Sequence, residues 1–111
     1  MHELTLANNL MVVIENEAKA RGFSRVLEIR IRAGTHSGVL PECLRECFTL
    51  AAAGSCAEGA ALSIDTVEAA VHCAGCGYDG PPKGWLCPRC GGEDIRLTAG
   101  REFYVESLAV E

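Results

Sequence analysis

Two stretches of the chain have the hydrophobic spacing of amphipathic helices. Within residues 5–20 the apolar positions follow the i, i+4, i+7, i+11 pattern of one helix face: Ala7, Met11, Ile14 and Ala18. Thr5 is a suitable N-cap, and Gly22 predicts the end of this helix. A second helix is predicted from Pro41, which needs no N–H at the first helical position, up to Gly54.

Other stretches have the spacing of β-strands. In residues 25–33 aliphatic residues alternate with Glu and Arg, so one face is apolar and the other is charged. A second strand is predicted over residues 61–71. Near the end of the chain, residues 95–97 and 102–105 predict a hairpin with its turn at Ala99-Gly100.

A segment rich in Cys, Gly and Pro interrupts this pattern after the second strand. We therefore predict an α+β fold: two helices packed on a small, mostly antiparallel three-stranded sheet, with a four-cysteine zinc-ribbon module inserted between two of its strands. The predicted domains are residues 1–72 with 95–111, and the zinc-binding module 73–94.

The inserted module contains two C-x-x-C pairs, which are the most specific signal in the chain. The pairs are ten residues apart and consist of Cys73 with Cys76 and Cys87 with Cys90. Four thiolates in a tetrahedron form a typical structural zinc site. Such a site has no open coordination position, so we expect it to fold the module and not to catalyse a reaction.

The local sequence bears on this interpretation. Gly77 and Gly91 follow the two pairs, where a left-handed turn would let backbone N–H groups point at sulfur. Iron in the same ligand set, as in a rubredoxin-like electron-transfer site, is the main alternative. Free thiols are disfavoured because the module has too little apolar material to fold without metal. Redox chemistry is disfavoured because it usually needs one such pair at a helix N-terminus.

The remaining unusual residues have simpler interpretations. Cys43, Cys47 and Cys56 are expected to be small apolar fillers of the core. Tyr78 and Trp85, inside the module, are expected to pack locally.

Composition narrows the function classes. The chain has 111 residues, and its 49% of hydrophobic residues is typical of a globular protein. Its net charge of −5 and its 5% of aromatic residues argue against a nucleic-acid partner. The apolar runs are too short to cross a membrane, and the start has no signal-peptide pattern. We therefore expect a cytoplasmic protein with no membrane partner. In the reducing cytosol, paired cysteines hold metal more often than they form disulfides.

The first residues, Met1-His2-Glu3, are the second candidate metal site. They bring together the α-amine, the His2 backbone nitrogen and imidazole, and the backbone nitrogen and carboxylate of Glu3. Nitrogen-rich planar sets favour Ni²⁺ or Cu²⁺ over Zn²⁺. Taken alone, a histidine near a terminus is more often solvated.

Three segments together resemble the HypA/HybF family of nickel-insertion accessory proteins for nickel–iron hydrogenase. They are the Met1-His2-Glu3-Leu4-Thr5-Leu6 start, the Gly34-x-x-Ser37-Gly38-Val39-x-Pro41-Glu42-x-Leu44 segment, and the double C-x-x-C followed by Gly91-Gly92. The resemblance covers the whole chain. It implies a nickel metallochaperone and not an enzyme, with nickel as transported cargo at His2, bound through the imidazole and the backbone nitrogen, and Glu3 beside it. It also implies structural zinc at Cys73, Cys76, Cys87 and Cys90.

The resemblance also bears on partners and on further ligands. It implies a nickel-handling maturation GTPase and the hydrogenase large subunit as partners, and a homodimer is a further possibility. Some family members supply a nearby Asp to nickel, but residues 37–42 contain none. Glu42 is the acidic candidate there, and His36 is a second candidate whose simpler interpretation is a solvated loop histidine. His72 is interpreted as a strand-end residue or as a pH-sensitive neighbour of the zinc site.

Two other function classes remain as alternatives. A zinc-ribbon module could serve only to bind another protein, with an inert N-terminus. A small iron protein for electron transfer is the second alternative, and metal analysis would separate it from a zinc protein. The enzyme interpretation has little support, because the chain has no Ser-His-Asp set and no P-loop.

Overall fold

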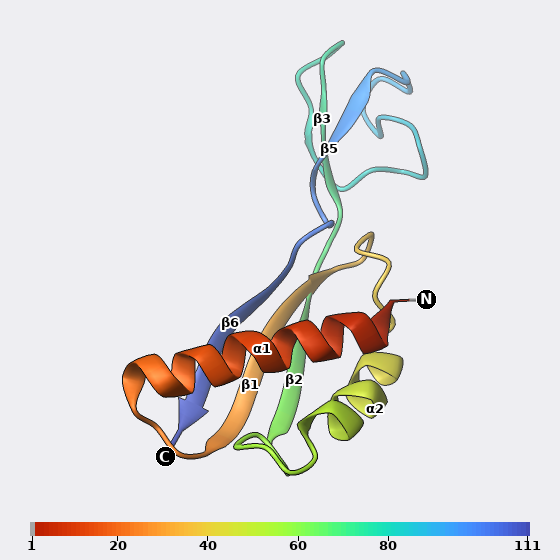
Figure 1. Ribbon diagram of the computed structural model, residues 1–111. Coiled ribbons are helices and arrows are strands. Elements are labelled where there is room, and N and C mark those ends of the chain that lie inside the picture. The colour runs from red at the N-terminus through yellow and green to blue at the C-terminus, as the bar shows by residue number, and fades with distance from the viewer. Residues whose placement is uncertain (1) are drawn as a thin grey trace. The chain divides into compact units, whose positions relative to one another are not determined.

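A computed structural model describes residues 2–111, which form two helices and six strands (Figure 1). In chain order these are α1 (Glu3–Arg21), β1 (Val26–Gly34), α2 (Pro41–Ala52), β2 (Ala61–Val67), β3 (Ala70–Cys73), β4 (Asp79–Gly80), β5 (Ile95–Ala99) and β6 (Phe103–Val110). The helices and the two three-stranded sheets confirm the predicted α+β class.

The described chain divides into two compact units, which we describe separately. The helical unit contains the chain up to Ile31, Val39–Ile64 and Val105–Glu111. The cysteine unit contains Arg32–Gly38 and Asp65–Tyr104. The domain division that the sequence predicts, with boundaries beside residues 73 and 94, stays a prediction.

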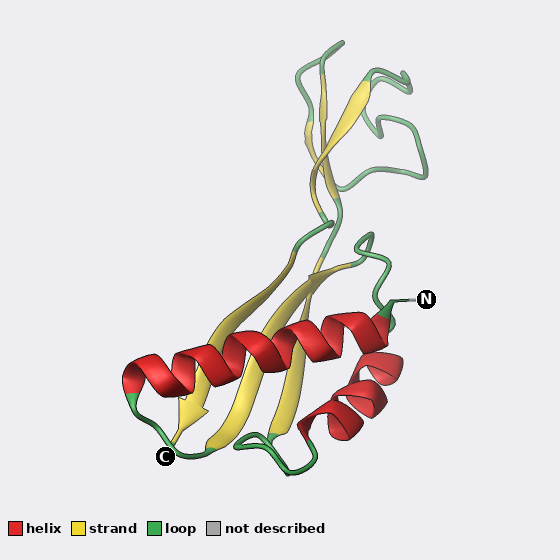
Figure 2. Ribbon diagram, in the orientation of Figure 1, coloured by secondary structure: helices red, strands yellow, loops and turns green. Residues whose placement is uncertain are grey.

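The core of the helical unit lies between the helices and one face of the sheet β2-β1-β6 (Figure 2). Each fully buried aliphatic side chain there stabilises the fold by about 2 kcal/mol. The buried apolar residues of α1, of β1 up to Ile31 and of α2 are Ala7, Leu10, Met11, Ile14, Val26, Ile29, Ile31, Leu44, Phe48 and Ala52. Two predicted boundaries are confirmed, since Gly22 caps α1 with φ 76° and Pro41 begins α2.

Backbone hydrogen bonds give the strand directions in this sheet. Gly34 N–H donates to the Glu102 carbonyl at 2.7 Å, and Glu111 N–H donates to the Arg25 carbonyl at 2.8 Å. Residue numbers rise along β1 as they fall along β6, so this pair is antiparallel.

The second pair in this sheet, β1 with β2, has its strands in the same direction. Val26 N–H donates to the Cys56 carbonyl at 2.9 Å, and Thr35 N–H donates to the Val67 carbonyl at 3.0 Å. Because both numbers rise together, β1 and β2 are parallel. A parallel pair needs a crossover, and α2 supplies it.

The chain between β2 and β6 departs from the sequence prediction. The single strand expected over residues 61–71 is two strands in different sheets, since β3 pairs with β4 and β5 in the order β4-β3-β5. The expected hairpin of residues 95–97 and 102–105 is wrong for the same reason. The strand β5 pairs antiparallel with β3, whereas β6 pairs with β1.

A close approach of two glycines accompanies this change of sheet. A Cβ placed on Gly34 would lie 1.9 Å from the Gly100 carbonyl oxygen, and Gly100 itself has a φ of 115°. The chain can pass this close only because Gly34 has no side chain, and a Cβ on Gly100 would in turn lie 2.9 Å from Ala69 Cα. Gly100 is therefore a crossing point between strands of different sheets and not the tip of a hairpin.

Candidate metal centres

The four sulfurs of the two C-x-x-C pairs lie within 4.8 Å of one another. The distance from Cys73 Sγ to Cys90 Sγ is 3.8 Å, and from Cys76 Sγ to Cys87 Sγ it is 3.6 Å. Both are far longer than the sulfur–sulfur bond of a disulfide, about 2.05 Å. Tetrahedral zinc, with bonds of about 2.3 Å, holds its sulfurs about 3.8 Å apart. The structure therefore brings the four predicted cysteines together at the separation that one metal ion requires.

The loops around this four-cysteine cluster explain why the sulfurs converge. Gly77 and Gly91 have φ of 78° and 72°, as the sequence predicts. Their N–H groups close each turn on the carbonyl of the first cysteine of the pair, at 2.8 and 2.9 Å. Other backbone donors point at sulfur: Cys90 N–H lies 3.4 Å from Cys87 Sγ, and Gly92 N–H lies 3.4 Å from Cys90 Sγ. These donors stabilise negative charge on the thiolates.

Arg89 contacts this cluster, and the sequence analysis did not identify it. Its Nη2 donates to the Cys76 carbonyl at 2.6 Å, and its guanidinium lies 5.9 Å from the centre of the Tyr78 ring. Its hydrogen bond to the Cys76 sulfur, helped by the Tyr78 N–H, lowers the pKa of that thiol to about 6. The signal in the sequence was a cation between two ligands, Cys87-Pro88-Arg89-Cys90.

The sulfurs of the cluster differ in acidity. The Gly92 N–H lowers the pKa of Cys90, but hydrogen bonds with the other three sulfurs outweigh it and raise the pKa to about 11. Because a metal ligand must be a thiolate, metal binding here releases protons and strengthens as pH rises.

His72 lies directly before the cluster and has a partner in the neighbouring strand. Its Nδ1 is 2.8 Å from Asp79 Oδ1, and the two residues face each other across β3 and β4. This cross-strand pair accounts for the strand-end interpretation of His72.

The second candidate site lies where α1 begins. His2 is exposed and occupies the N-cap position, and Glu3 is the first helical residue. The α-amine of Met1, which the predicted ligand set includes, lies outside the described residues. The helix begins at Glu3, two residues before the predicted N-cap Thr5.

Glu3 is buried, with 2% of its surface exposed. Its Oε1 accepts the His2 N–H at 3.3 Å, and its Oε2 accepts the Leu40 N–H at 3.1 Å. Leu40 is in turn the N-cap of α2, so one carboxylate connects the first residues of both helices. The pKa of Glu3 is lowered, first by the Leu40 N–H and then by its own and the His2 backbone N–H.

The two further nickel-ligand candidates, Glu42 and His36, lie in different units of the structure. Glu42 is exposed in the first turn of α2. The His36 Nδ1 is 3.2 Å from Thr35 Oγ1, and its ring meets the Trp85 ring edge-on at a centroid distance of 6.2 Å. His36 belongs to the cysteine unit, whereas His2 belongs to the helical unit.

Two expectations about packing are wrong. Cys43 is exposed and not part of the core, while Cys47 and Cys56 are half-buried. Trp85 is 80% exposed despite its contact with His36.

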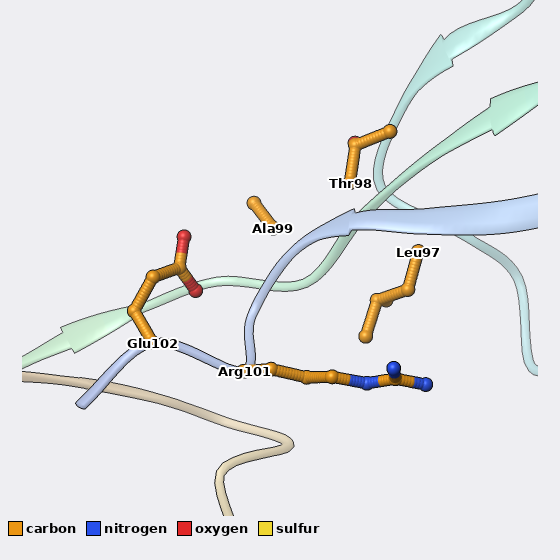
Figure 3. A pocket seen from close by; sticks show the side chains of 5 residues that line it. All are labelled: Leu97, Thr98, Ala99, Arg101 and Glu102. Atoms are coloured by element: carbon orange, nitrogen blue, oxygen red, sulfur yellow. The ribbon is translucent and has the colours of Figure 1, made fainter.

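A hollow of about 350 Å³ adjoins the chain crossing at Gly100 (Figure 3). In it, Leu97 points toward the extended side chain of Arg101. The Glu102 carboxylate is engaged, because its Oε1 accepts the Gly100 N–H at 2.6 Å. Glu102 therefore stabilises the backbone at Gly100, and it is the one carboxylate among the residues that line the hollow. The hollow offers no set of metal ligands. Within residues 2–111, no helix is long and apolar enough to cross a membrane.

Comparison with known sequences gives matches along the full length. The profile of a family described as "Hydrogenase/urease nickel incorporation, metallochaperone, hypA" matches residues 1–110. The chain is 37% identical over 113 residues to "Hydrogenase maturation factor HypA" of Geobacter sulfurreducens, covering 100% of both chains. It is 38% identical over 113 residues to the protein of the same description from Methylocella silvestris, again covering 100% of both.

Solved structures share the fold. The "Solution structure of the Ni metallochaperone HypA from Helicobacter pylori" matches with a TM-score of 0.71 and 21% identity, covering 99% of this chain and 97% of that one. A second, the "Solution structure of HypA protein", matches with a TM-score of 0.77 and 21% identity, covering 100% and 97%.

Proposed function

Because the chain belongs to the HypA family of hydrogenase nickel-incorporation metallochaperones, we propose that it binds Ni²⁺ at its N-terminus and delivers it for maturation of nickel–iron hydrogenase. The observation that carries this proposal is the full-length family match in a chain that begins Met1-His2-Glu3 and holds a four-cysteine cluster. Members of this family carry metal and are not enzymes.

His2 and Glu3 form the proposed nickel site. The exposed His2 supplies its imidazole and its backbone nitrogen, and Glu3 adds its own backbone nitrogen. The Glu3 carboxylate already accepts two backbone N–H groups, so it holds the His2 amide beside the helix end. An exposed site at a terminus suits a carrier, which must also release its metal. Protonation of the imidazole weakens binding, because the ligand must be neutral.

Zinc is the proposed ion at Cys73, Cys76, Cys87 and Cys90, and its role is structural. The sulfur separations of 3.6 and 3.8 Å fit a closed tetrahedral site. Iron would fit the same four sulfurs, so metal analysis decides: one zinc per chain supports the proposal, and one iron per chain supports the electron-transfer alternative.

The proposed partners follow from the family. They are the nickel-handling GTPase of the maturation pathway and the hydrogenase large subunit that receives the ion. A homodimer is the further proposed assembly, and sedimentation of the purified protein tests it.

Nickel titration of untagged protein, with the His2→Ala variant, tests the proposed site. We expect His2→Ala to abolish nickel binding and to leave one zinc per chain, because the four-cysteine cluster uses no residue of the N-terminus. His36→Ala, which also removes an exposed histidine, is the matched control and should bind nickel normally. Unchanged nickel affinity in His2→Ala would contradict the site.

A further inference from the structure

Solvent reaches two of the four cysteines of the cluster and not the other two. Cys73 and Cys87 are buried, with 0% and 2% of their surface exposed, whereas Cys76 is half-buried and Cys90 is exposed. A closed tetrahedral site has no free position, so a competing chelator must displace a ligand before it can bind the ion. We expect it to displace an accessible thiolate first. The groups that hold Cys76 and Cys90 in place therefore bear on how long the site keeps its ion.

Arg89 lies between the two cysteines of the second pair and reaches across to the first pair. Its Nη2 donates to the Cys76 carbonyl at 2.6 Å, and its guanidinium also hydrogen-bonds the Cys76 sulfur. A Cβ on Gly77 would lie 3.9 Å from the same Nη2, so the guanidinium packs against the turn that follows Cys76. One side chain therefore connects the two C-x-x-C loops at an accessible ligand.

The Tyr78 ring holds the guanidinium in this position. Arg89 Cζ lies 5.9 Å from the centre of the ring, within the range of a cation–π contact. The ring is itself fixed, because Tyr78 Oη donates to the Pro81 carbonyl at 2.7 Å. A Cβ on Gly80 would lie 2.8 Å from the same Oη, so the ring lies against backbone that has no side chain. Arg89 is therefore exposed to solvent and yet held by two partners.

Arg89 also brings a positive charge to the cluster. Four thiolates carry more negative charge than one Zn²⁺ neutralises, so a nearby cation stabilises the site. A lysine would supply the same charge. It would not supply the planar group that hydrogen-bonds a carbonyl while it lies against an aromatic ring. Substitution can therefore separate the charge of Arg89 from its geometry.

We propose that Arg89 is a positioning residue that slows the release of zinc, because it ties Cys76 to the second cysteine loop. This inference rests on the proposed zinc at the four-cysteine cluster. Arg89 is not itself a ligand, since four sulfurs complete a tetrahedral set. Its removal leaves every ligand in the chain and changes how fast the ligand set opens.

Zinc release from the full-length chain tests this inference. Each protein is reconstituted with one Zn²⁺ per chain under reducing conditions and mixed with an excess of a chromogenic chelator. Arg89→Ala should release zinc about fivefold faster or more, as expected for the loss of a charge-assisted hydrogen bond at an exposed position. Arg89→Lys should be intermediate, because it keeps only the charge. The matched control is Arg96→Ala, which removes an exposed arginine from β5 of the same unit and should match the parent.

Two outcomes would overturn the inference. Equal release rates for Arg89→Ala and Arg96→Ala would show that Arg89 does not hold the site. Arg89→Lys as slow as the parent would show that charge alone acts, without positioning. If Arg89→Ala fails to retain zinc at all, the comparison of Arg89→Lys with the parent decides in its place.

The metal content of the chain as purified separates this inference from the proposed function. Iron in place of zinc would contradict the proposed zinc. The zinc-reconstituted chain would still show whether Arg89 slows release, because that measurement does not depend on which ion the chain held when purified. Conversely, one zinc per chain with release rates that do not depend on Arg89 would contradict the inference alone.

Discussion

Glu3 shows how a single buried side chain can prepare an exposed site. Its carboxylate accepts hydrogen bonds from two backbone N–H groups, one of its neighbour His2 and one of Leu40, which lies 37 residues further along the chain. A charged residue near a helix start is usually exposed, so the sequence pattern predicts a carboxylate beside nickel but not its burial. The missing information was the tertiary contact with Leu40.

We predict that Glu3→Gln lowers the thermal midpoint of unfolding by several degrees near neutral pH. The amide is a weaker acceptor than the carboxylate and lacks its charge at the helix N-terminus. Because the folded pKa of Glu3 is lowered, its contribution is present above the ordinary value of 4.5 and is lost as pH falls through the folded value.

The matched control for this change is Glu42→Gln, in the first turn of α2, where the side chain is exposed. Melting curves of the parent and both variants from pH 7 to acid pH provide the measurement. The difference between parent and Glu3→Gln should shrink on acidification. A Glu3→Gln protein as stable at neutral pH as Glu42→Gln would show that the buried carboxylate is unimportant.

The sequence predicts an element correctly where the residues of that element determine its structure. It fails where the structure depends on which other strand lies beside the element. Helix α1 follows from its apolar spacing and Gly22, and the four-cysteine cluster follows from the spacing of its ligands. The strands β5 and β6 were recognised, but they were wrongly paired with each other. A period-2 pattern indicates that a segment is extended and does not identify the strand beside it.

The crossing at Gly34 and Gly100 gives an element-scale prediction. Gly34→Ala should destabilise the protein by about 2 kcal/mol or more, because the new Cβ would overlap the Gly100 carbonyl and force a backbone shift. Gly75→Ala is the matched control, since its Cβ would meet only Cys73 Sγ at 3.7 Å. Denaturant unfolding of both variants, with zinc content measured, should place only Gly34→Ala clearly below the parent.

On the scale of the whole molecule, the described chain assigns different chemistry to its two units. The helical unit carries the proposed nickel site at the start of α1, and the cysteine unit carries the four-cysteine cluster and the exposed Trp85. The sequence pattern predicted both sets of proposed metal ligands. It did not reveal the exposure of Trp85, because burial of an aromatic residue depends on surrounding chain that local spacing does not describe.

The central claim is that nickel is held by the first residues of the chain. The most direct test is nickel titration of three forms of the protein: untagged, extended at the N-terminus, and extended at the C-terminus by the same nickel-inert sequence. An N-terminal extension converts the α-amine into an amide and places chain before His2. We predict that only this form loses nickel binding, while all three keep one zinc per chain. Equal nickel binding by the two extended forms would contradict the claim.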